Sequence, residues 1–453
     1  MKQKNTLDTD KIGKLVFRLA IPSMLAQFVS VLYSIVDRMY IGNISEVGDT
    51  ALAAVGVCGP IVTLIAAFAS LVGIGGSPLM SIKLGEKDEE GASKILANSF
   101  MMLSILSIVL MCVTYLLKDK LLMWFGASQV TFPYANEYLS IYLVGTIFAL
   151  LSVGMNQFII CQGFATNGMI SVLIGAVANL VLDPVFIFGL GMGVRGAALA
   201  TILSQMASAG YVLWFLFSKK VIIPIRFGGY EGKTMRKIAL LGLSPFVIIA
   251  TDNVLIILLN TVLQRYGGAE RGDMLLASAT IVQSFMLMVT MPLGGITGGT
   301  QTILGYNYGA RRPDRILRAQ KLIVLLGCGF TFLMFVIAQT VPHLFIQLFT
   351  SNPEYVRLCE WAIRISTIGL IPLAVQYAIV DGFTGMGIAK IAITLSLFRK
   401  SIYLISLVVI PLYFDISKVF YAETLSDLIS PIITTIVYFI TIQKVLSKRN
   451  QPC

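Results

Sequence analysis

Charged residues are scarce in this chain. Only 13% of its 453 residues are Asp, Glu, Lys or Arg, whereas 57% are hydrophobic, and soluble domains carry about twice that charged fraction. The sequence has one histidine, His343, and its six cysteines form no CxxC pair and no Cys/His cluster. These shortages exclude a soluble domain of useful size, a multi-histidine metal site, a recognisable zinc site and a disulfide framework.

Two further absences concern targeting and partners. The first residues, MKQKNTLDTDKIGK, lack the apolar core and small-residue cleavage site of a signal peptide. The net charge of +11 could suggest a nucleic-acid ligand, but the basic residues cluster in alternate loops, which indicates membrane topology instead. We therefore expect no nucleic-acid partner, and we expect a monomer embedded in a lipid bilayer.

Long uncharged runs are abundant, and many exceed the 18 or so residues that cross a bilayer. They predict an all-α polytopic membrane protein with twelve spans. The turn GFATNG, at 163–168, divides a run that is too long for one span. The expected spans are 13–40, 51–81, 92–117, 133–162, 168–190, 195–218, 237–264, 274–305, 316–342, 355–385, 388–413 and 418–446.

The distribution of Lys and Arg predicts the orientation. Most of them lie in the two tails and in the loops after even-numbered spans, so both termini should be cytoplasmic in a bacterial plasma membrane. The expected organisation is a cytoplasmic tail (1–12), a first lobe of six spans (13–218), a cytoplasmic linker (219–236), a second lobe of six spans (237–446) and a second cytoplasmic tail (447–453).

The two halves repeat. Pro22 corresponds to Pro245, and several further residues recur at nearly the same spacing. Six spans per half give both halves the same orientation, as in parallel-repeat transporters, and predict a binding cavity between the halves. The recurring residues are Gly75 and Gly85 with Gly299 and Gly309, and Gln157, Gly163, Phe164 and Gly168 with Gln376, Gly382, Phe383 and Gly387.

Two aspartates interrupt the uncharged runs of the first half. Asp37 ends the run 19–36, and Asp183 ends the run 138–182. A carboxylate within hydrocarbon is costly, so such a residue indicates a functional site. Asn179 lies one helical turn before Asp183. Counted at 1.5 Å per residue, Asp37, Asp183 and Thr201 all fall in the outer half of the membrane.

These residues form a hard-oxygen set that suits Na⁺ or a proton. Pro184 has no N–H, so the carbonyl of Leu180 loses its usual helical partner and could join the set. Two neighbouring acids titrate as a pair, and such a pair could exchange a cation as its exposure changes. Asn156 is a weaker candidate, because its depth is nearer the cytoplasm. The alternative is that these polar groups are satisfied by hydrogen bonds between helices.

The second half does not repeat this site, because Asp37 corresponds there to the neutral Asn260. Asp252 is expected to be the only other acid well inside a span, where it could bind a cationic substrate or hold the halves together. Arg399 and Lys400 are expected near the inner edge, where they could reach water. Asp381 and Glu423 are expected to be interfacial or gate residues. The candidates for the substrate cavity are Asp252, Asn260, Gln283, Met286 and Met291.

Two glycine-rich runs, GIGGSP and GGITGG, lack the lysine of a phosphate-binding loop and follow no soluble strand. They indicate close helix packing and bending instead.

The chain resembles the multidrug and toxic compound extrusion (MATE) transporters over nearly its whole length, and the bacterial MepA-like and DinF-like branch fits better than the NorM-like branch. The resemblance rests on IPSMLAQFVSVLYSIVDRMYIGN in the first span, QGFATNG, and NLVLDPVFIFGLGMGVRGAALAT across spans five and six. It implies export of organic, often cationic and amphipathic drugs by antiport with inward Na⁺ or H⁺, without a cofactor. It also implies a cation site at Asp37, Asn179, Asp183 and Thr201, with Asn156 in the surrounding network.

Three alternatives are weighed against antiport. A flippase for lipid-linked or polysaccharide cargo would share the fold, but the scarcity of Arg inside the spans disfavours it. A membrane-embedded enzyme would need a catalytic cluster, and the sequence contains no HExxH motif and no Ser/His pair. A channel fits poorly with two repeats that enclose one asymmetric ion site.

Overall fold

The computed structural model describes residues 6–44 and 47–450, which contain helices and no strand. The first half begins with a short helix, continues with long helices and ends in a linker. Its elements are α1 (Thr6–Thr9), α2 (Ile12–Gly42), α3 (Gly48–Gly85), α4 (Glu89–Trp124), α5 (Phe132–Val144), α6 (Thr146–Ile160), α7 (Ala165–Pro184), the π-helical turn η1 (Val185–Gly189) and α8 (Gly193–Phe217).

The second half follows the same order. Its first element, α9, is broken at Gly268, where φ is 69°, and therefore consists of two antiparallel helical limbs. The elements are α9 (Gly232–Gly309), α10 (Pro313–Thr340), α11 (Pro342–Ile346), α12 (Pro353–Ser366), α13 (Leu370–Gly385), α14 (Ala389–Tyr413), the 3₁₀ turn η2 (Ile416–Phe420) and α15 (Tyr421–Asn450).

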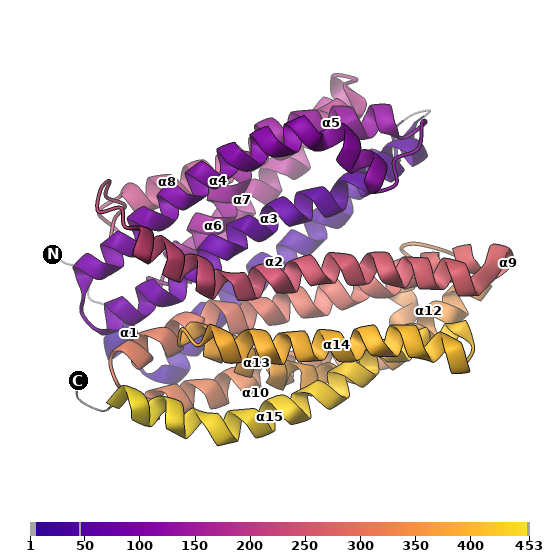
Figure 1. Ribbon diagram of the computed structural model, residues 1–453. Helices are drawn as coiled ribbons and strands as arrows, with labels where there is room; N and C mark the ends of the chain where they lie inside the picture. The colour runs from indigo at the N-terminus through magenta and orange to yellow at the C-terminus, as the bar shows by residue number, and fades with distance from the viewer. Residues whose placement is uncertain (1–5, 45–46, 451–453) are drawn as a thin grey trace.

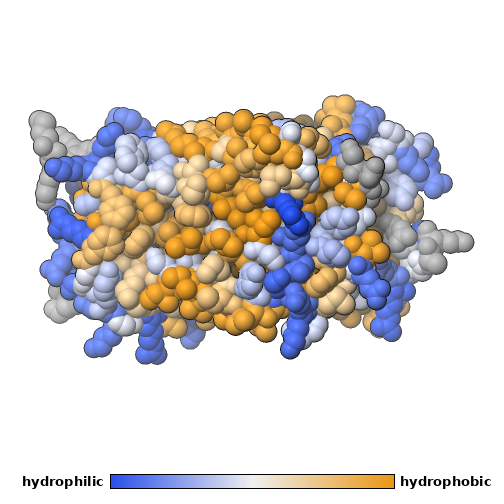
Figure 2. All heavy atoms as spheres, turned by 90° about the horizontal axis from the view of Figure 1, so that it is seen from above, coloured by the Kyte–Doolittle hydropathy of each residue, from blue (hydrophilic) through white to orange (hydrophobic). Residues whose placement is uncertain are grey.

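The helices have the length and apolarity needed to cross a membrane. Within the described ranges, ten helices pass this test singly, and two bent pairs bring the number of spans to twelve. On the face shown in Figure 2, apolar residues dominate the middle and hydrophilic residues gather toward both ends. Helices satisfy their own backbone hydrogen bonds in hydrocarbon, so the predicted all-α membrane fold is confirmed.

The two bent spans occupy equivalent positions in the two halves. The α5–α6 pair bends by 57° at Gly145, and the α12–α13 pair bends by 50° across a short break that ends at Gly369. A Cβ on Gly145 would lie 2.5 Å from Ile202 of α8, and one on Gly369 would lie 2.5 Å from Cβ of Asp427 of α15. Both bends therefore depend on glycine, because each lets a neighbouring helix approach the backbone.

The helices form two bundles, which meet at the end that carries both termini and diverge toward the other end (Figure 1). Glycines make the contact between the bundles. A Cβ on Gly85 would lie 2.0 Å from the carbonyl oxygen of Tyr306, and one on Gly309 would lie 2.0 Å from that of Ile82. A Cβ on Gly75 would similarly lie 2.3 Å from the carbonyl oxygen of Ile238.

Three of the recurring glycines, Gly75, Gly85 and Gly309, thus mark places where helices of opposite lobes cross at backbone distance. Gly299 belongs to the same group, because a Cβ there would lie 2.3 Å from Oγ of Ser23 on α2. The glycine-rich runs serve close packing, as expected from small residues at helix crossings in membranes.

Charged contacts join the lobes at the same end. Arg312 lies 2.6 Å from a carboxylate oxygen of Asp8, and the guanidinium of Arg315 donates to the carbonyl oxygens of Leu7 and Asp10 at 3.2 and 3.1 Å. Arg449 also forms an ion pair with Glu86. Backbone-level packing and ion pairs therefore close the lobes together at the terminal end.

Candidate functional site

The carboxyl groups of Asp37 on α2 and Asp183 on α7 lie within hydrogen-bonding reach of one another. Asp183 is fully buried, and Asn179 is 4% exposed. Nδ2 of Asn179 donates to Oδ1 of Asp183 at 3.2 Å. Among the described residues, one oxygen of each carboxyl, Oδ1 of Asp37 and Oδ2 of Asp183, is buried without a hydrogen-bond partner.

The local sequence explains this geometry. Asn179 and Asp183 are four residues apart and share one face of α7, so the amide can reach the carboxylate along the helix. Pro184 then ends the regular α-helix, and the chain continues as the π-helical turn η1. The amide of Val185 donates to the carbonyl of Leu182. The carbonyl of Leu180 receives no donor from Pro184, because proline has no N–H.

Thr201 reaches the pair through a residue that sequence reasoning missed. Its hydroxyl donates to the carbonyl of Ala197 at 2.9 Å and lies within hydrogen-bonding reach of the side chain of Tyr138 on α5. Tyr138 is 6% exposed and interacts electrostatically with Asp37. The hydroxyl of Tyr138 thus links α8 to the carboxyl pair. The feature of the sequence that could have identified Tyr138 is its place as the first residue of the uncharged run 138–182.

Asn156 lies elsewhere in the first lobe. Its Oδ1 would be 3.0 Å from a Cβ on Gly168, in the first turn of α7, whereas Asp183 lies near the last turn. The separation along α7 is about 22 Å at 1.5 Å per residue. The structure therefore brings Asp37, Asn179, Asp183 and, through Tyr138, Thr201 together, and it places Asn156 near the opposite end of the same helix.

The first-lobe site fits a small hard cation or a proton. Its donors are carboxylate, amide and hydroxyl oxygens, which are poor ligands for soft metals. The described residues contain no group of three or more His, Cys, Asp or Glu side chains that could hold a metal ion. A buried carboxyl oxygen without a partner is costly, and either a shared proton or a bound monovalent cation would satisfy both orphan oxygens at once.

The second lobe contains a cavity of about 230 Å³ between the limbs of α9 and helices α13, α14 and α15. Asp252, Gln283 and Met286, three of the residues proposed for a substrate cavity between the halves, line this space, which lies inside one lobe. Asn260 and Met291 are outside its lining. The other polar lining residues are Thr290, Ser366, Tyr377, Arg399, Lys400, Tyr403, Glu423 and Ser426.

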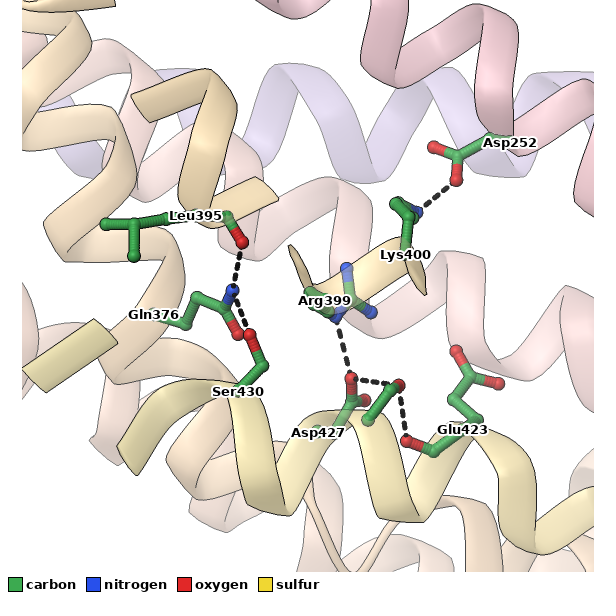
Figure 3. Close-up of polar contacts among 9 residues, drawn as sticks. Asp252, Gln376, Leu395, Arg399, Lys400, Glu423, Asp427 and Ser430 are labelled. Atoms are coloured by element: carbon green, nitrogen blue, oxygen red, sulfur yellow. Dashed lines mark hydrogen bonds and ion pairs between the residues drawn. The ribbon is translucent and has the colours of Figure 1, made fainter. Parts of the chain in front are cut away.

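Two expectations for this lobe were wrong. Arg399 and Lys400 lie in the middle of α14, with only 13% and 15% of their side chains exposed. Acids on other helices compensate the two charges. Nε of Arg399 donates to Oδ1 of Asp427 at 2.8 Å, and Nζ of Lys400 donates to Asp252 (Figure 3). Pairing inside the lobe replaces the expected contact with water at the membrane edge.

Asp252 is also not the only additional acid well inside a span. Asp427, two turns into α15, is fully buried, and it accepts hydrogen bonds from Arg399 and, at 3.2 Å, from Ser426. Glu423 precedes it by one turn and lines the cavity. Asp381, near the end of α13, accepts a hydrogen bond from Thr297 of α9. The second lobe is thus richer in buried charge than its sequence suggested.

Two helical lobes that span a membrane, with partner-deficient carboxylates buried in one and a polar cavity in the other, define a membrane transporter of the two-lobe class. The MatE family model matches residues 22–185 and 249–412, one segment in each lobe. The chain therefore belongs to the MatE family, the MATE transporters that its sequence resembles, and it is not an enzyme.

Relatives and solved structures agree with this assignment. The multidrug export protein MepA of Staphylococcus haemolyticus (strain JCSC1435) is 26% identical over 382 residues, which cover 84% of this chain and 82% of the relative. MepA of Staphylococcus aureus (strain MSSA476) is 24% identical over 380 residues, with 83% and 81% covered. An outward-facing structure of a multidrug resistance MATE transporter superposes with a TM-score of 0.91 at 22% identity, covering 98% and 99%.

Proposed function

We propose that this chain is a secondary active exporter of organic compounds, coupled to inward movement of Na⁺ or H⁺ at the Asp37–Asp183 pair. The observation that carries the proposal is that these two carboxyls lie together in the first lobe, each with a buried oxygen that has no hydrogen-bond partner in the part of the chain that the structure describes. The cation would satisfy those oxygens, and its release would leave them unsatisfied again.

Coupling requires that the cation bind two conformations of the protein with different affinity. Asp37 belongs to α2, which packs against both α7 and the second-lobe helix α9. Movement of α2 relative to α7 would separate Asp37 from Asp183 and weaken cation binding. Because α2 also contacts the other lobe, the same movement would change the contact between the lobes. This shared helix gives a physical route from cation binding to alternating access.

The proposed cargo follows from family membership and from the names of the relatives. The MepA proteins are named as multidrug exporters, which supports drug-like substrates for this chain, including organic cations. The second-lobe cavity supports this cargo, because it combines acids with apolar and aromatic side chains, such as Met286 and Phe420. Drug export of this kind would confer resistance to antibiotics.

The orientation proposed from the basic loops places both termini in the cytoplasm. The lobes are closed at the terminal end and diverge at the other (Figure 1), so the present conformation would be the outward-facing one. In that state the cation enters from outside, and substrate leaves to the same side.

The test is efflux from vesicles or cells that carry an imposed Na⁺ or pH gradient, scored with a cationic fluorescent dye. Asp37→Asn and Asp183→Asn should each abolish gradient-driven efflux while leaving expression and thermal stability near those of the unmodified protein. Asp119→Asn is the matched control, because that carboxylate is 67% exposed. Full efflux by both site variants would contradict the coupling assignment.

The same vesicles distinguish the two coupling ions. Efflux driven by a Na⁺ gradient at equal pH on both sides supports Na⁺, whereas efflux driven by a pH gradient without Na⁺ supports H⁺. Transport that neither gradient drives would overturn antiport.

A flippase for lipid-linked or polysaccharide cargo remains the second candidate. Arg399 and Lys400 inside the second lobe favour anionic cargo more than the sequence suggested. Each is nevertheless paired with an acid, so the cavity is not a cationic groove, and antiport of drugs is the better-supported proposal.

A further inference from the structure

A basic groove of about 650 Å³ lies between the start of α2, in the first lobe, and the first turns of α10, in the second lobe. It belongs to the end of the molecule where the lobes are closed together (Figure 1). None of its described lining residues is acidic, and four are basic. The lining residues are Lys11, Ile12, Gly13, Arg315, Arg318, Lys321, Leu322 and Leu325.

The sequence of α10 places its part of the lining on one side of the helix. Arg315, Arg318 and Lys321 follow one another at intervals of three residues, and Leu325 comes four residues later, so their side chains are neighbours. Counted at 1.5 Å per residue from Pro313, Lys321 lies about 12 Å and Leu325 about 18 Å along the helix. The lining therefore changes from basic to apolar with depth.

Three of the four bases are available to a ligand. Arg315 is already held, because its guanidinium donates to Oδ1 of Asn307 at 2.9 Å and to two backbone carbonyls of the α1 segment. Lys11, Arg318 and Lys321 are exposed. Within residues 6–44 and 47–450, the side chains of these three form no hydrogen bond and no ion pair.

The acids nearby do not neutralise this groove. Asp8 pairs with Arg312 at 2.6 Å, and Asp10 pairs with Arg18 at 2.9 Å. Asp314, in the first turn of α10, is not part of the lining. The tendency of basic residues to lie at the cytoplasmic side accounts for bases in this loop, but not for their convergence on one groove that crosses from lobe to lobe.

Exposed apolar side chains continue the groove away from its basic end. Leu325 on α10 and Phe17 on α2 are both more than half exposed. Phe17 follows Gly13 by four residues and so lies on the same face of α2. Gly13 leaves open space, because nothing lies within 4 Å of a Cβ built there. An extended hydrocarbon chain therefore has room beside α2 and an apolar surface to cover.

We propose that this groove binds an anionic phospholipid. The headgroup phosphate lies among Lys11, Arg318 and Lys321, and an acyl chain passes Gly13 and Leu325. Basic pockets between transmembrane helices suit such headgroups, because long basic side chains cover apolar surface with their stems and keep their charged ends in water. A zwitterionic headgroup fits less well, since no acid in the lining receives its cation.

The lipid would contact α2 of one lobe and α10 of the other, and so hold the lobes together at the closed end. The site is separate from the proposed cation site and from the cargo. Only its assignment to the cytoplasmic leaflet rests on the proposed orientation.

Native mass spectrometry of the purified full chain in detergent measures the affinity for the first lipid that binds. The probes are dioleoyl phosphatidylglycerol and dioleoyl phosphatidylcholine, which share their acyl chains and differ in headgroup charge. The unmodified protein should bind phosphatidylglycerol about tenfold more tightly or better. Glycerol phosphate, which has the phosphate but no chain, should not displace the lipid at equal concentration.

The charges are tested with Arg318→Gln/Lys321→Gln. Phosphatidylglycerol should bind about thirtyfold more weakly, which corresponds to about 1 kcal/mol for each base. The variant should fold normally, because both side chains are exposed. Lys237→Gln/Lys390→Gln is the matched control, because it removes the same charge from exposed positions outside the groove. It should change the affinity less than about twofold, since distant exposed charges are screened.

The groove itself is tested with Gly13→Phe, which fills the space without changing the charge. Nothing within 4 Å opposes the new Cβ, so the fold should persist, and the affinity for phosphatidylglycerol should fall to that for phosphatidylcholine. Gly210→Phe on α8 is the matched control, because that exposed glycine also has nothing within 4 Å of a Cβ. It should bind phosphatidylglycerol as the unmodified protein does.

Equal affinity of the unmodified protein for the two lipids would overturn the proposal. So would an unchanged affinity for phosphatidylglycerol in either Arg318→Gln/Lys321→Gln or Gly13→Phe. Displacement by glycerol phosphate would show a site for free phosphate in place of a lipid. Asp183→Asn separates these outcomes from failure of the proposed function, because it should bind phosphatidylglycerol normally even where gradient-driven efflux is lost.

Discussion

Asp183 and Asp427 are both fully buried carboxylates, but their partners differ in kind. Asp183 has an amide and a second acid, so the described residues around it supply no compensating positive charge at hydrogen-bonding distance. Asp427 has the guanidinium of Arg399. The first arrangement is suited to binding and releasing a cation, and the second holds its charge permanently.

Removal of one partner from the Arg399–Asp427 pair should destabilise the second lobe. Asp427→Asn leaves the buried guanidinium uncompensated, so we expect the free energy of unfolding to fall by about 3–5 kcal/mol. The double variant Arg399→Gln/Asp427→Asn removes both charges and should recover most of the loss. Thermal unfolding of the purified protein measures both effects.

An exposed pair provides the comparison. Arg271 and Asp415 are about half exposed, and an exposed pair contributes about 0–1 kcal/mol, so Arg271→Gln should change stability little. If Asp427→Asn melts at the same temperature as the unmodified protein, the pair has no structural role.

At the scale of residues, the sequence pointed to the Asp37–Asp183 pair but not to the Arg399–Asp427 pair. Asp37 and Asp183 were found because each interrupts a long uncharged run. Asp427 was missed because its depth depends on where η2 ends and α15 begins, and because its partner Arg399 lies 28 residues earlier. Pairing across helices depends on their rotation and register, which hydropathy along one chain does not contain.

At the scale of single helices, the spans were predictable from the sequence but their bends were not. The spans themselves were predictable, since apolar length decides whether a helix can cross a bilayer. The bends at Gly145 and Gly369 were not, because hydropathy is continuous across them. They are visible only once α8 and α15 are packed against the glycine backbones.

Gly369→Ala should disturb the second lobe through this contact. The new Cβ would lie 2.5 Å from Cβ of Asp427, so α15 must shift and the Arg399–Asp427 pair must lengthen. We expect lower thermal stability, because a longer pair compensates the buried guanidinium less well. Gly329→Ala on α10 is the matched control, because nothing lies within 4 Å of a Cβ there and alanine favours the helix. Equal effects of the two substitutions would show that the bend does not depend on close packing.

The two lobes and their shared contact determine the shape of the whole molecule. The repeat predicted two similar lobes, and the family model matches one segment in each. The recurring glycines at positions 75, 85, 299 and 309 proved to be points of contact between the lobes, a role that no single half can reveal. The sequence could not predict the conformation, because the same helices can pack with either end of the molecule closed.

Substitution of one contact glycine should shift the balance between conformations. In Gly309→Ala the new Cβ would lie 2.0 Å from the carbonyl oxygen of Ile82, so the lobes cannot close fully at the terminal end. Spin labels on Glu90 and Arg318, one in each lobe, should report a longer distance than in the otherwise unmodified protein. Gly298→Ala lies on the same limb of α9 with nothing within 4 Å of its Cβ, and it should leave the distance unchanged. An unchanged distance in Gly309→Ala would show that this glycine does not limit closure.

The confinement of the proposed cation site to one carboxyl pair has an electrical consequence. Exchange of one monovalent coupling ion for one monovalent organic cation moves no net charge, so the membrane potential would contribute nothing to such export. For a compound with no net charge, the same exchange would carry one elementary charge inward, which supplies about 2.3 kcal/mol per 100 mV. At that potential the voltage alone would sustain a concentration ratio of roughly fifty. The two classes of cargo would thus differ in how steeply their export depends on membrane voltage, although they share one transporter and one coupling ion.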